Sequence, residues 1–394
     1  MNSIFSVFRP AFPDAENNLG KGGARIKVLH VIKNFNLGGA ETNLLNLIRA
    51  TDGRRVEAYV GYSKGGEIEG RFLQAGAKLF KYAARDHKVK SAATLAIVAR
   101  LAAYIRKNGI DIVHTHNFNA HVWGLMAAKL TGRKLVEHVH DFRYLDLEEF
   151  KRRKGSVFQY RYIKYFKNLS DRVVVLTRQD VDFLLRKGYY PEAKVREIKN
   201  GIPLEPGRYP AEKIRARLGL GPGSPVVLAS ARLSPEKNIS LILDIAPQVV
   251  REVPEVQFVI AGDGPLKNEL EARVRSEKLS ENVRFIGFYE DIHELLNVSD
   301  IFLLPSYLEL HSIAILEALS MRVPVVASRG VGCNSEMLRD GLDGFLLDPF
   351  SPNGWARAVV KLLKDPDLRR SVGERGYALC REQFDVRDVA KKFE

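Results

Sequence analysis

The alternation of short apolar runs with amphipathic segments constrains the fold more than any other feature of this chain. From Arg25 onward, runs rich in β-branched residues are separated by stretches with helical spacing of apolar residues, at 42–49, 91–107 and 119–130. The runs in the first half are IKVLHVI, VEAYVG, DIVHTH, KLVEHVH and RVVVLT. Strands that alternate with helices form parallel sheets covered on both faces. This half therefore predicts a doubly wound α/β domain.

A segment dense in Pro and Gly, NGIPLEPGRYP at 200–210, interrupts the pattern. The alternation then resumes with PVVLASA, VQFVIAG, VRFIG, DIFLLPS, PVVAS and GFLLD. A chain of 394 residues is also too long for one ordinary core. We therefore expect a flexible leader at 1–24, Rossmann-like domains at 25–200 and 211–375, and a linker at 201–210. Ligands bind at the carboxyl ends of such strands, so the two sheets are expected to face a central cleft.

Composition narrows the function classes. The two cysteines, Cys333 and Cys380, have no metal-ligand spacing, which excludes a disulfide framework and favours a reducing cytoplasm. No apolar stretch approaches the roughly 20 residues of a membrane-spanning helix. The N-terminus also lacks the apolar core of a secretory signal. The net charge of +14 fits nucleic acid, an anionic membrane or a phosphorylated substrate, so its distribution must decide.

The stretch PSYLELHSIAILEALS, at 305–320, carries the strongest chemical signal. A predicted strand ends before it, Glu309 falls in a loop, and a helix that contains Glu317 is expected to begin near Ser312. The first turn of a helix presents unpaired N–H groups and a partial positive charge, which suit a diphosphate. Carboxylates suit sugars because they accept hydrogen bonds from hydroxyl groups. The alternative, a structural role for Glu317 on a helix surface, is disfavoured by its apolar neighbours.

This stretch resembles the E-x7-E motif of glycosyltransferase family 4, and ASARLSPEKN, at 229–238, is similar to that family's G-R-L-x-x-x-K loop. The resemblance implies a GT-B fold, a nucleoside-diphosphate sugar as donor, and transfer with retention at the anomeric carbon. It implies that Arg232 and Lys237 hold the donor diphosphate. It further implies that Glu309 binds the transferred sugar and Glu317 the ribose. Guanidinium and ammonium groups are the usual partners of phosphate, so the chemistry agrees.

The resemblance extends over almost the whole chain after Arg25. The donor-side positions that it assigns to AGDGP and FIGF are Gly262, Gly264 and Phe288. The segment Leu310, His311 and Ser312 departs from the family's usual Gly-Phe-Gly, so sugar selection does not carry over. Its amides are still expected to face the donor phosphate. The tail at 376–394 resembles the family's closing helix, which crosses back to the first domain.

The first domain carries motifs for the acceptor side. NLGGAE resembles the family's G-G-A-E loop, in which glycines such as Gly38 and Gly39 let the backbone approach the donor phosphate and the acceptor. It differs from the G-x-G-x-x-G of dinucleotide enzymes, so a dehydrogenase loses its main support. The second histidine of HTHN faces the reaction centre in the family. The catalytic candidates are therefore His116, Glu309, Arg232 and Lys237, and the acceptor-side candidates are Asn36, His116, His140 and Asp141.

Two patterns raise the question of a metal. HTHN and HVHD supply four histidines, but alternate residues on a strand point the same way. His114 and His116 are therefore expected to share one face of a pair of neighbouring strands rather than to complete a closed four-ligand site. The DVD at Asp180 and Asp182 mimics the D-x-D of metal-dependent transferases, yet it falls in a helix-like segment, 178–187, and is interpreted as surface. No metal or other cofactor is expected, because Arg232, Lys237 and the N-terminus of the predicted helix can neutralise a leaving diphosphate.

Much of the positive charge lies at 150–167, FKRRKGSVFQYRYIKYFK, which holds seven basic residues, six aromatic residues and no acid. A basic amphipathic helix with an aromatic face suits an anionic bilayer surface. The alternative is that the aromatic stripe packs on the first domain. Single-stranded RNA is a further ligand of such a pattern, but no nucleic-acid recognition motif accompanies it.

The sequence therefore predicts a metal-independent, retaining hexosyltransferase. Its acceptor is expected to be lipid-linked or part of a cell-envelope glycan, and its location the cytoplasm or the inner face of the cytoplasmic membrane. Two alternatives stay open: another GT-B enzyme, such as a nucleotide-sugar epimerase or hydrolase, and a catalytically inactive sugar- or lipid-binding subunit.

Overall fold

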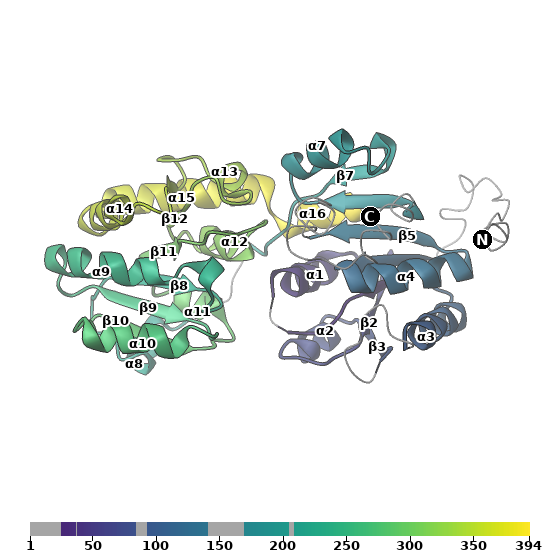
Figure 1. Cartoon of the computed structure of the whole chain (residues 1–394), viewed down its shortest axis with the longest axis horizontal. Coiled ribbons are helices and arrows are strands. Elements are labelled where there is room, and N and C mark those ends of the chain that lie inside the picture. Colours follow the sequence, from purple (N-terminus) through teal and green to yellow (C-terminus); the bar gives the residue numbers. More distant parts are fainter. Residues whose placement is uncertain (1–24, 37, 84–92, 141–168, 205–208) are drawn as a thin grey trace.

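The chain folds into two lobes, each built on one parallel sheet (Figure 1). The computed structural model describes residues 25–36, 38–83, 93–140, 169–204 and 209–394. Both sheets are covered by helices on their two faces, and the hydrophobic core of each lobe lies between its sheet and these helices. The prediction of two Rossmann-like, doubly wound domains is confirmed.

The N-terminal sheet has seven strands in the order β3-β2-β1-β4-β5-β6-β7, all paired in parallel. The order reverses beside β1, as in a doubly wound fold. The strands are β1 (Ile26–Val31), β2 (Val56–Tyr62), β3 (Lys78–Lys81), β4 (Ile112–His116), β5 (Lys134–Val139), β6 (Arg172–Val175) and β7 (Val195–Glu197). The helices are α1 (Gly39–Ala50), α2 (Glu69–Gln74), α3 (Ala93–Asn108), α4 (Phe118–Thr131), α7 (Arg178–Arg186) and the 3-10 helix η5 (Glu192–Lys194).

The C-terminal sheet has six parallel strands in the order β10-β9-β8-β11-β12-β13. They are β8 (Val226–Ser230), β9 (Gln257–Ala261), β10 (Val283–Gly287), β11 (Ile301–Leu304), β12 (Val325–Ser328) and β13 (Phe345–Leu347). The helices here are α8 (Ala211–Arg217), η6 (Pro235–Lys237), α9 (Ser240–Glu252), α10 (Lys267–Ser276), α11 (Ile292–Leu296), α12 (Ile313–Ser320), α13 (Asn334–Met337), α14 (Pro352–Lys364) and α15 (Pro366–Gln383).

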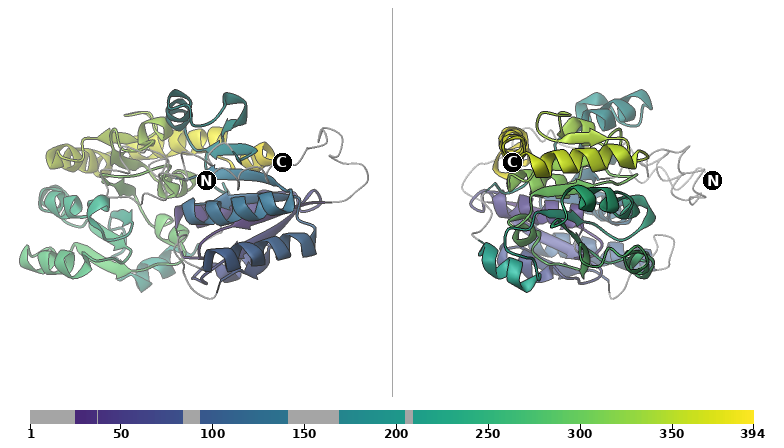
Figure 2. Two further views of the ribbon diagram at one scale, coloured as in Figure 1. Left: turned by 45° about the vertical axis from the view of Figure 1, so that its right-hand side comes forward. Right: turned by 90° about the vertical axis from the view of Figure 1, so that its left-hand side faces the viewer.

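The chain crosses between the lobes twice, and the two crossings are hydrogen-bonded to each other. The Ile202 amide donates to the Phe384 carbonyl at 2.8 Å, and the Val386 amide donates to the Ile202 carbonyl at 3.1 Å. After the second crossing, α16 (Val386–Phe393) packs against α1, so the last helix belongs to the N-terminal lobe (Figures 1 and 2). There Val389 packs with Val174 and Ile198. The lobes are thus joined on one side and face each other on the other.

Candidate active site

A cleft of about 980 Å³ lies between the lobes, at the carboxyl ends of both sheets. This is where ligands bind in doubly wound folds. Most of the site residues predicted from the sequence lie on its walls. These are Gly38, Gly39, His140, Arg232, Lys237, Glu309, Leu310, His311, Ser312 and Glu317. The two lobes therefore contribute to one site.

Helix α12 points its N-terminus into the cleft. Ser312 caps it, with its Oγ accepting from the Ile315 amide at 3.4 Å. The N–H groups of Ile313 and Ala314 lie in the first turn, where no carbonyl of the helix can accept from them. Both residues line the cleft. From the opposite lobe, Gly39 approaches this point so closely that a Cβ built on it would lie 3.6 Å from Ile313 Cγ1. A helix N-terminus opposite a glycine loop can hold an anion between two backbones.

Lys237 and Glu309 form an ion pair at the floor of the cleft. The Lys237 Nζ lies 2.7 Å from Glu309 Oε1, and the Ser306 hydroxyl donates to the same oxygen at 2.7 Å. Lys237 ends the short helix η6, while Glu309 follows β11, so residues far apart in sequence meet here. Arg232 is exposed at the same wall. The ammonium group is therefore positioned by a carboxylate and remains open to a second anionic partner.

Glu317 lies on α12 and is partly buried. Burial raises the pKa of its carboxyl group from 4.5 to about 7; His293 nearby lowers this pKa and Asp291 raises it further. Among the described residues its side chain has no hydrogen-bonding partner in the structure, and it lines the cleft. A carboxylate that is desolvated without a partner is costly. It can be stabilised by a ligand that brings hydroxyl donors.

His311 belongs to the segment that differs from the family's usual Gly-Phe-Gly. It is buried, and neither of its ring nitrogens has a hydrogen-bond partner in the described structure. Burial, and to a lesser extent the charge of Lys199, lower the pKa of His311 to about 3, so the ring is neutral at pH 7. It packs edge-on to Phe384, with ring centroids 5.5 Å apart. The Asn200 amide donates to the His311 carbonyl at 3.1 Å, which ties the loop to the first interlobe crossing.

Four predicted positions take other places. Gly262 and Gly264 do not line the cleft; a Cβ on either would overlap the backbone of Ala231 or Leu233, so these glycines let the loop after β9 pack on the loop after β8. Their expected closeness to the nucleotide stays a prediction. Phe288 is 50% exposed and Asn36 is exposed, and neither lines the cleft. Asp141 and the segment 150–167 lie outside the described residues.

Five buried histidines gather on one face of the N-terminal sheet. Register pairs His30 on β1 with His114 on β4, and His116 on β4 with His138 on β5; His140 follows on the same face. His30 Nδ1 lies 3.3 Å from His116 Nε2, and His116 Nδ1 lies 3.0 Å from His140 Nε2. Burial lowers the pKa of His30 to about 3 and of His140 to about 4, and lowers the others well below 6.5.

The cluster changes the interpretation of two sequence motifs. The histidines of HTHN share one strand face with those of HVHD, as expected, and His30 joins them from the first strand, whose histidine the motifs did not include. His116 lies behind His140, and only His140 lines the cleft. His116 therefore contacts the residue that lines the cleft rather than the cleft itself. In the DVD segment, Asp180 is buried at 7% exposure rather than on the surface, and burial raises its pKa to about 6, while Asp182 pairs with Arg178 at 3.1 Å.

The cleft also contains charged residues that the motifs did not reveal. Arg49 and Arg71, on α1 and α2 of the N-terminal lobe, both line it. Burial lowers the pKa of Arg49, and the charge of Arg71 lowers it further. Arg71 reaches across the cleft to Glu290, with Nη2 and Oε1 2.8 Å apart. Two arginines on separate helices have no sequence signature, because only the fold brings them together.

Comparisons with known proteins identify the class. Residues 37–206 match the family model "Glycosyltransferase Family 4", and residues 210–379 match "Glycosyl transferases group 1". The chain is 30% identical over 272 residues to the UDP-Gal:alpha-D-GlcNAc-diphosphoundecaprenol alpha-1,3-galactosyltransferase of Escherichia coli, which covers 67% of this chain and 69% of that protein. It is 29% identical over 289 residues to the alpha-D-kanosaminyltransferase of Streptomyces kanamyceticus, with 70% and 73% covered.

A solved structure shares the fold of this chain. The crystal structure of Anabaena HepE in complex with UDP and glucose superposes with a TM-score of 0.78 at 22% identity, covering 94% of this chain and 98% of that one. The chain belongs to the GT-B glycosyltransferases of the group 1 and family 4 type. It is a glycosyltransferase, as its sequence predicts.

Replacing Glu317 with Gln should raise stability and lower donor affinity. The Glu317 carboxyl ionises near pH 4.5 in the unfolded chain but only near pH 7 in the folded protein, so the folded state loses stability as the pH rises between these values. At about 1.36 kcal/mol for each pKa unit, this loss approaches roughly 3 kcal/mol. Glu317→Gln removes it, so the variant should melt higher than wild type at pH 8 and little differently at pH 4.5. Nucleoside diphosphate affinity should fall by on the order of tenfold.

Melting temperatures from pH 4.5 to 8, and titration calorimetry with UDP, check both parts on one preparation. Glu269→Gln, an exposed position on α10, is the matched control. A variant that binds nucleotide as tightly as wild type would contradict the ribose assignment.

Proposed function

We propose that this protein is a retaining hexosyltransferase that uses a nucleoside-diphosphate sugar and needs no divalent metal for transfer. The ion pair of Lys237 and Glu309 beneath the N-terminus of α12 supports this most directly. It provides a cation for the leaving diphosphate and a carboxylate for the hydroxyls of the transferred sugar. The relative from Escherichia coli uses UDP-Gal by its name, so UDP-sugars are the first donors to test.

In the proposed reaction the bond between the anomeric carbon and the diphosphate oxygen breaks. The acceptor oxygen attacks from the same face, and the acceptor proton passes to the leaving diphosphate. Lys237, Arg232 and the amides of Ile313 and Ala314 neutralise the charge that develops on that leaving group. Gly38 and Gly39 close the phosphate site from the other lobe. His140 stands at the acceptor side, with His116 fixing its ring through the 3.0 Å contact.

Lys237→Ala should lower transfer by on the order of 10- to 100-fold, since a charge-assisted hydrogen bond contributes about 1.5–3 kcal/mol. Lys267→Ala, which removes a partly exposed lysine paired with Asp263 outside the cleft, should leave the rate unchanged. Initial rates with UDP-sugars are measured with and without EDTA, and products are analysed with and without acceptor.

Turnover that EDTA abolishes and magnesium restores would contradict metal-independent transfer. Release of free sugar or of an epimer as the main product would indicate a hydrolase or an epimerase instead. Absence of any turnover with every donor would indicate a binding subunit.

The acceptor we propose is lipid-linked and anionic. Arg49 and Arg71 place two guanidinium groups on the acceptor lobe at the cleft. Arg71 pairs with Glu290, whereas Arg49 has a like charge beside it, which an anionic ligand would offset. The relative from Escherichia coli acts, by its name, on a sugar carried by diphosphoundecaprenol. A diphosphate between lipid and sugar has the charge and the fork-compatible oxygens that arginine binds.

Arg49→Ala should raise the KM for a lipid diphosphate-linked acceptor by roughly tenfold, while the donor KM stays unchanged, because a lost charged contact costs about 1.5 kcal/mol or more. Arg54→Ala, an exposed arginine of the same lobe paired with Asp52, is the matched control. Steady-state kinetics are measured with a short-chain diphosphate-linked acceptor and with the matching uncharged glycoside. The comparison shows whether Arg49 recognises the diphosphate or another part of the acceptor. An equal effect on both acceptors would contradict diphosphate recognition.

We also propose that the enzyme works at the inner face of the cytoplasmic membrane. None of the helices in the described ranges is long and apolar enough to span a bilayer. The basic and aromatic segment 150–167 supports binding to an anionic surface. Sedimentation with phosphatidylglycerol vesicles should therefore retain the wild-type protein at low salt and lose it as salt rises. A protein that ignores these vesicles at low salt would point to a soluble acceptor.

A further inference from the structure

The buried histidine cluster has a property that glycosyl transfer does not explain. His30, His114 and His116 come from two neighbouring strands, and none of them lines the cleft. Each is nearly inaccessible, with exposures of 6%, 3% and 1%. A buried imidazole nitrogen without a partner is costly, and a strand core is more stably filled with apolar side chains. Of the three, His114 has Nε2 without a hydrogen-bond partner among the described residues, while His30 Nδ1 and His116 Nε2 contact each other. This contact of three buried rings points to a ligand for their nitrogens.

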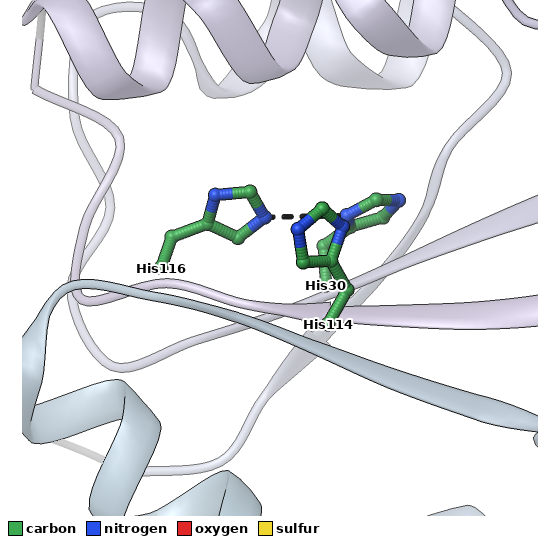
Figure 3. Close-up of side chains that lie close together, drawn as sticks. All are labelled: His30, His114 and His116. Atoms are coloured by element: carbon green, nitrogen blue, oxygen red, sulfur yellow. Dashed lines mark hydrogen bonds between the residues drawn. The ribbon is translucent and has the colours of Figure 1, made fainter. Parts of the chain in front are cut away.

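The three rings meet with their nitrogens close together (Figure 3). One ring nitrogen from each residue can be chosen so that all three lie within 4.8 Å of one another. His30 Nδ1 and His116 Nε2 are 3.3 Å apart. For zinc, with metal–nitrogen bonds of about 2.0–2.1 Å and tetrahedral angles, two ligand nitrogens lie roughly 3.3–3.4 Å apart. That pair already has the separation of a tetrahedral edge, and a ring nitrogen of His114 lies near enough to complete the triad.

The surroundings of the triad also suit a metal ion. A metal-bound histidine usually donates its other ring N–H to a neighbouring acceptor, which fixes its tautomer. His116 Nδ1 lies 3.0 Å from His140 Nε2, so His140 can accept that proton while Nε2 of His116 faces His30. The Nε2 atom of His114 has no hydrogen-bond partner within the described structure. Imidazole ligands select zinc and similar divalent transition metals over magnesium or calcium.

We propose that His30, His114 and His116 form a binding site for one divalent transition-metal ion of the zinc type. The ion would join β1 to β4 in the centre of the N-terminal sheet, so it would stabilise that lobe rather than activate the donor. This site is separate from the donor site, because its ligands lie outside the cleft and the donor diphosphate has cations of its own. Of the three ligands, His116 alone also contacts His140 at the proposed acceptor side.

The test uses the full chain, purified without a polyhistidine tag and stripped with a chelator under mild denaturant, then refolded. Zinc is titrated and measured by mass spectrometry of the metal after gel filtration, and cobalt(II) serves as a spectroscopic probe. We expect one equivalent of zinc to be retained, visible bands of histidine-bound cobalt to develop, and the melting temperature to rise by several degrees on zinc addition.

Three variants locate the site. His114→Asn and His30→Gln should each abolish stoichiometric binding and the zinc-dependent rise in melting temperature. His138→Asn, on the adjacent strand and equally buried, should retain both. Unchanged circular dichroism and UDP affinity in the metal-free variants would show that they fold.

Two outcomes would overturn the proposal. The first is a wild-type protein that retains no more zinc than His114→Asn. The second is an ion that His138→Asn loses and His114→Asn keeps, which would place it among His116, His138 and His140 instead. Because metal content and UDP binding are measured separately, failure of this proposal leaves the transfer chemistry untouched, and failure of transfer leaves the metal site untouched.

Discussion

The pairing of the two interlobe crossings is the constraint on which the cleft depends. Ile202 exchanges backbone hydrogen bonds with Phe384 and Val386, and Gly201 is held to the first lobe by the Asn43 side chain, which accepts from its amide at 3.2 Å. Because the two crossings are hydrogen-bonded side by side, the lobes can move relative to each other only about this connection. The opposite edges, which carry the Gly38–Gly39 loop and the N-terminus of α12, can then approach a donor from both sides.

Charge inside the cleft is arranged for a ligand rather than for the empty protein. Lys237 is already satisfied by Glu309, whereas Glu317 is desolvated and unpaired among the described residues, and Arg49 lies beside a second arginine. The burial of Glu317 and the closeness of Arg49 to a second arginine each cost stability in the absence of ligand. A donor with a ribose, a diphosphate and a sugar supplies hydroxyl donors and anionic oxygens at once, so binding energy is available where the fold alone is unfavourable.

How far the sequence predicts the structure depends on whether a residue acts through local pattern or through tertiary contact. All six strands of the second sheet and five of the first were recognisable as apolar runs, and so was the start of α12 near Ser312. The edge strands β3 and β7 were not, since KLFK and VRE are short and partly exposed. Asp180, His30 and the arginines of the cleft depend on packing between distant segments, for which periodicity contains no signal.

The departure at Leu310 shows how a motif can change while its geometry persists. Glycine in this place gives the family loop its freedom, and leucine removes it. Here the Cys333 amide donates to the Leu310 carbonyl at 3.2 Å, and Gly332, with a φ of 51°, packs so closely that a Cβ would overlap the Glu309 and Leu310 carbonyls. Only a residue without a Cβ fits at this φ and this closeness, so Gly332 lets the neighbouring segment pack against the loop. The loop is fixed from outside, and the amides of α12 still face the cleft.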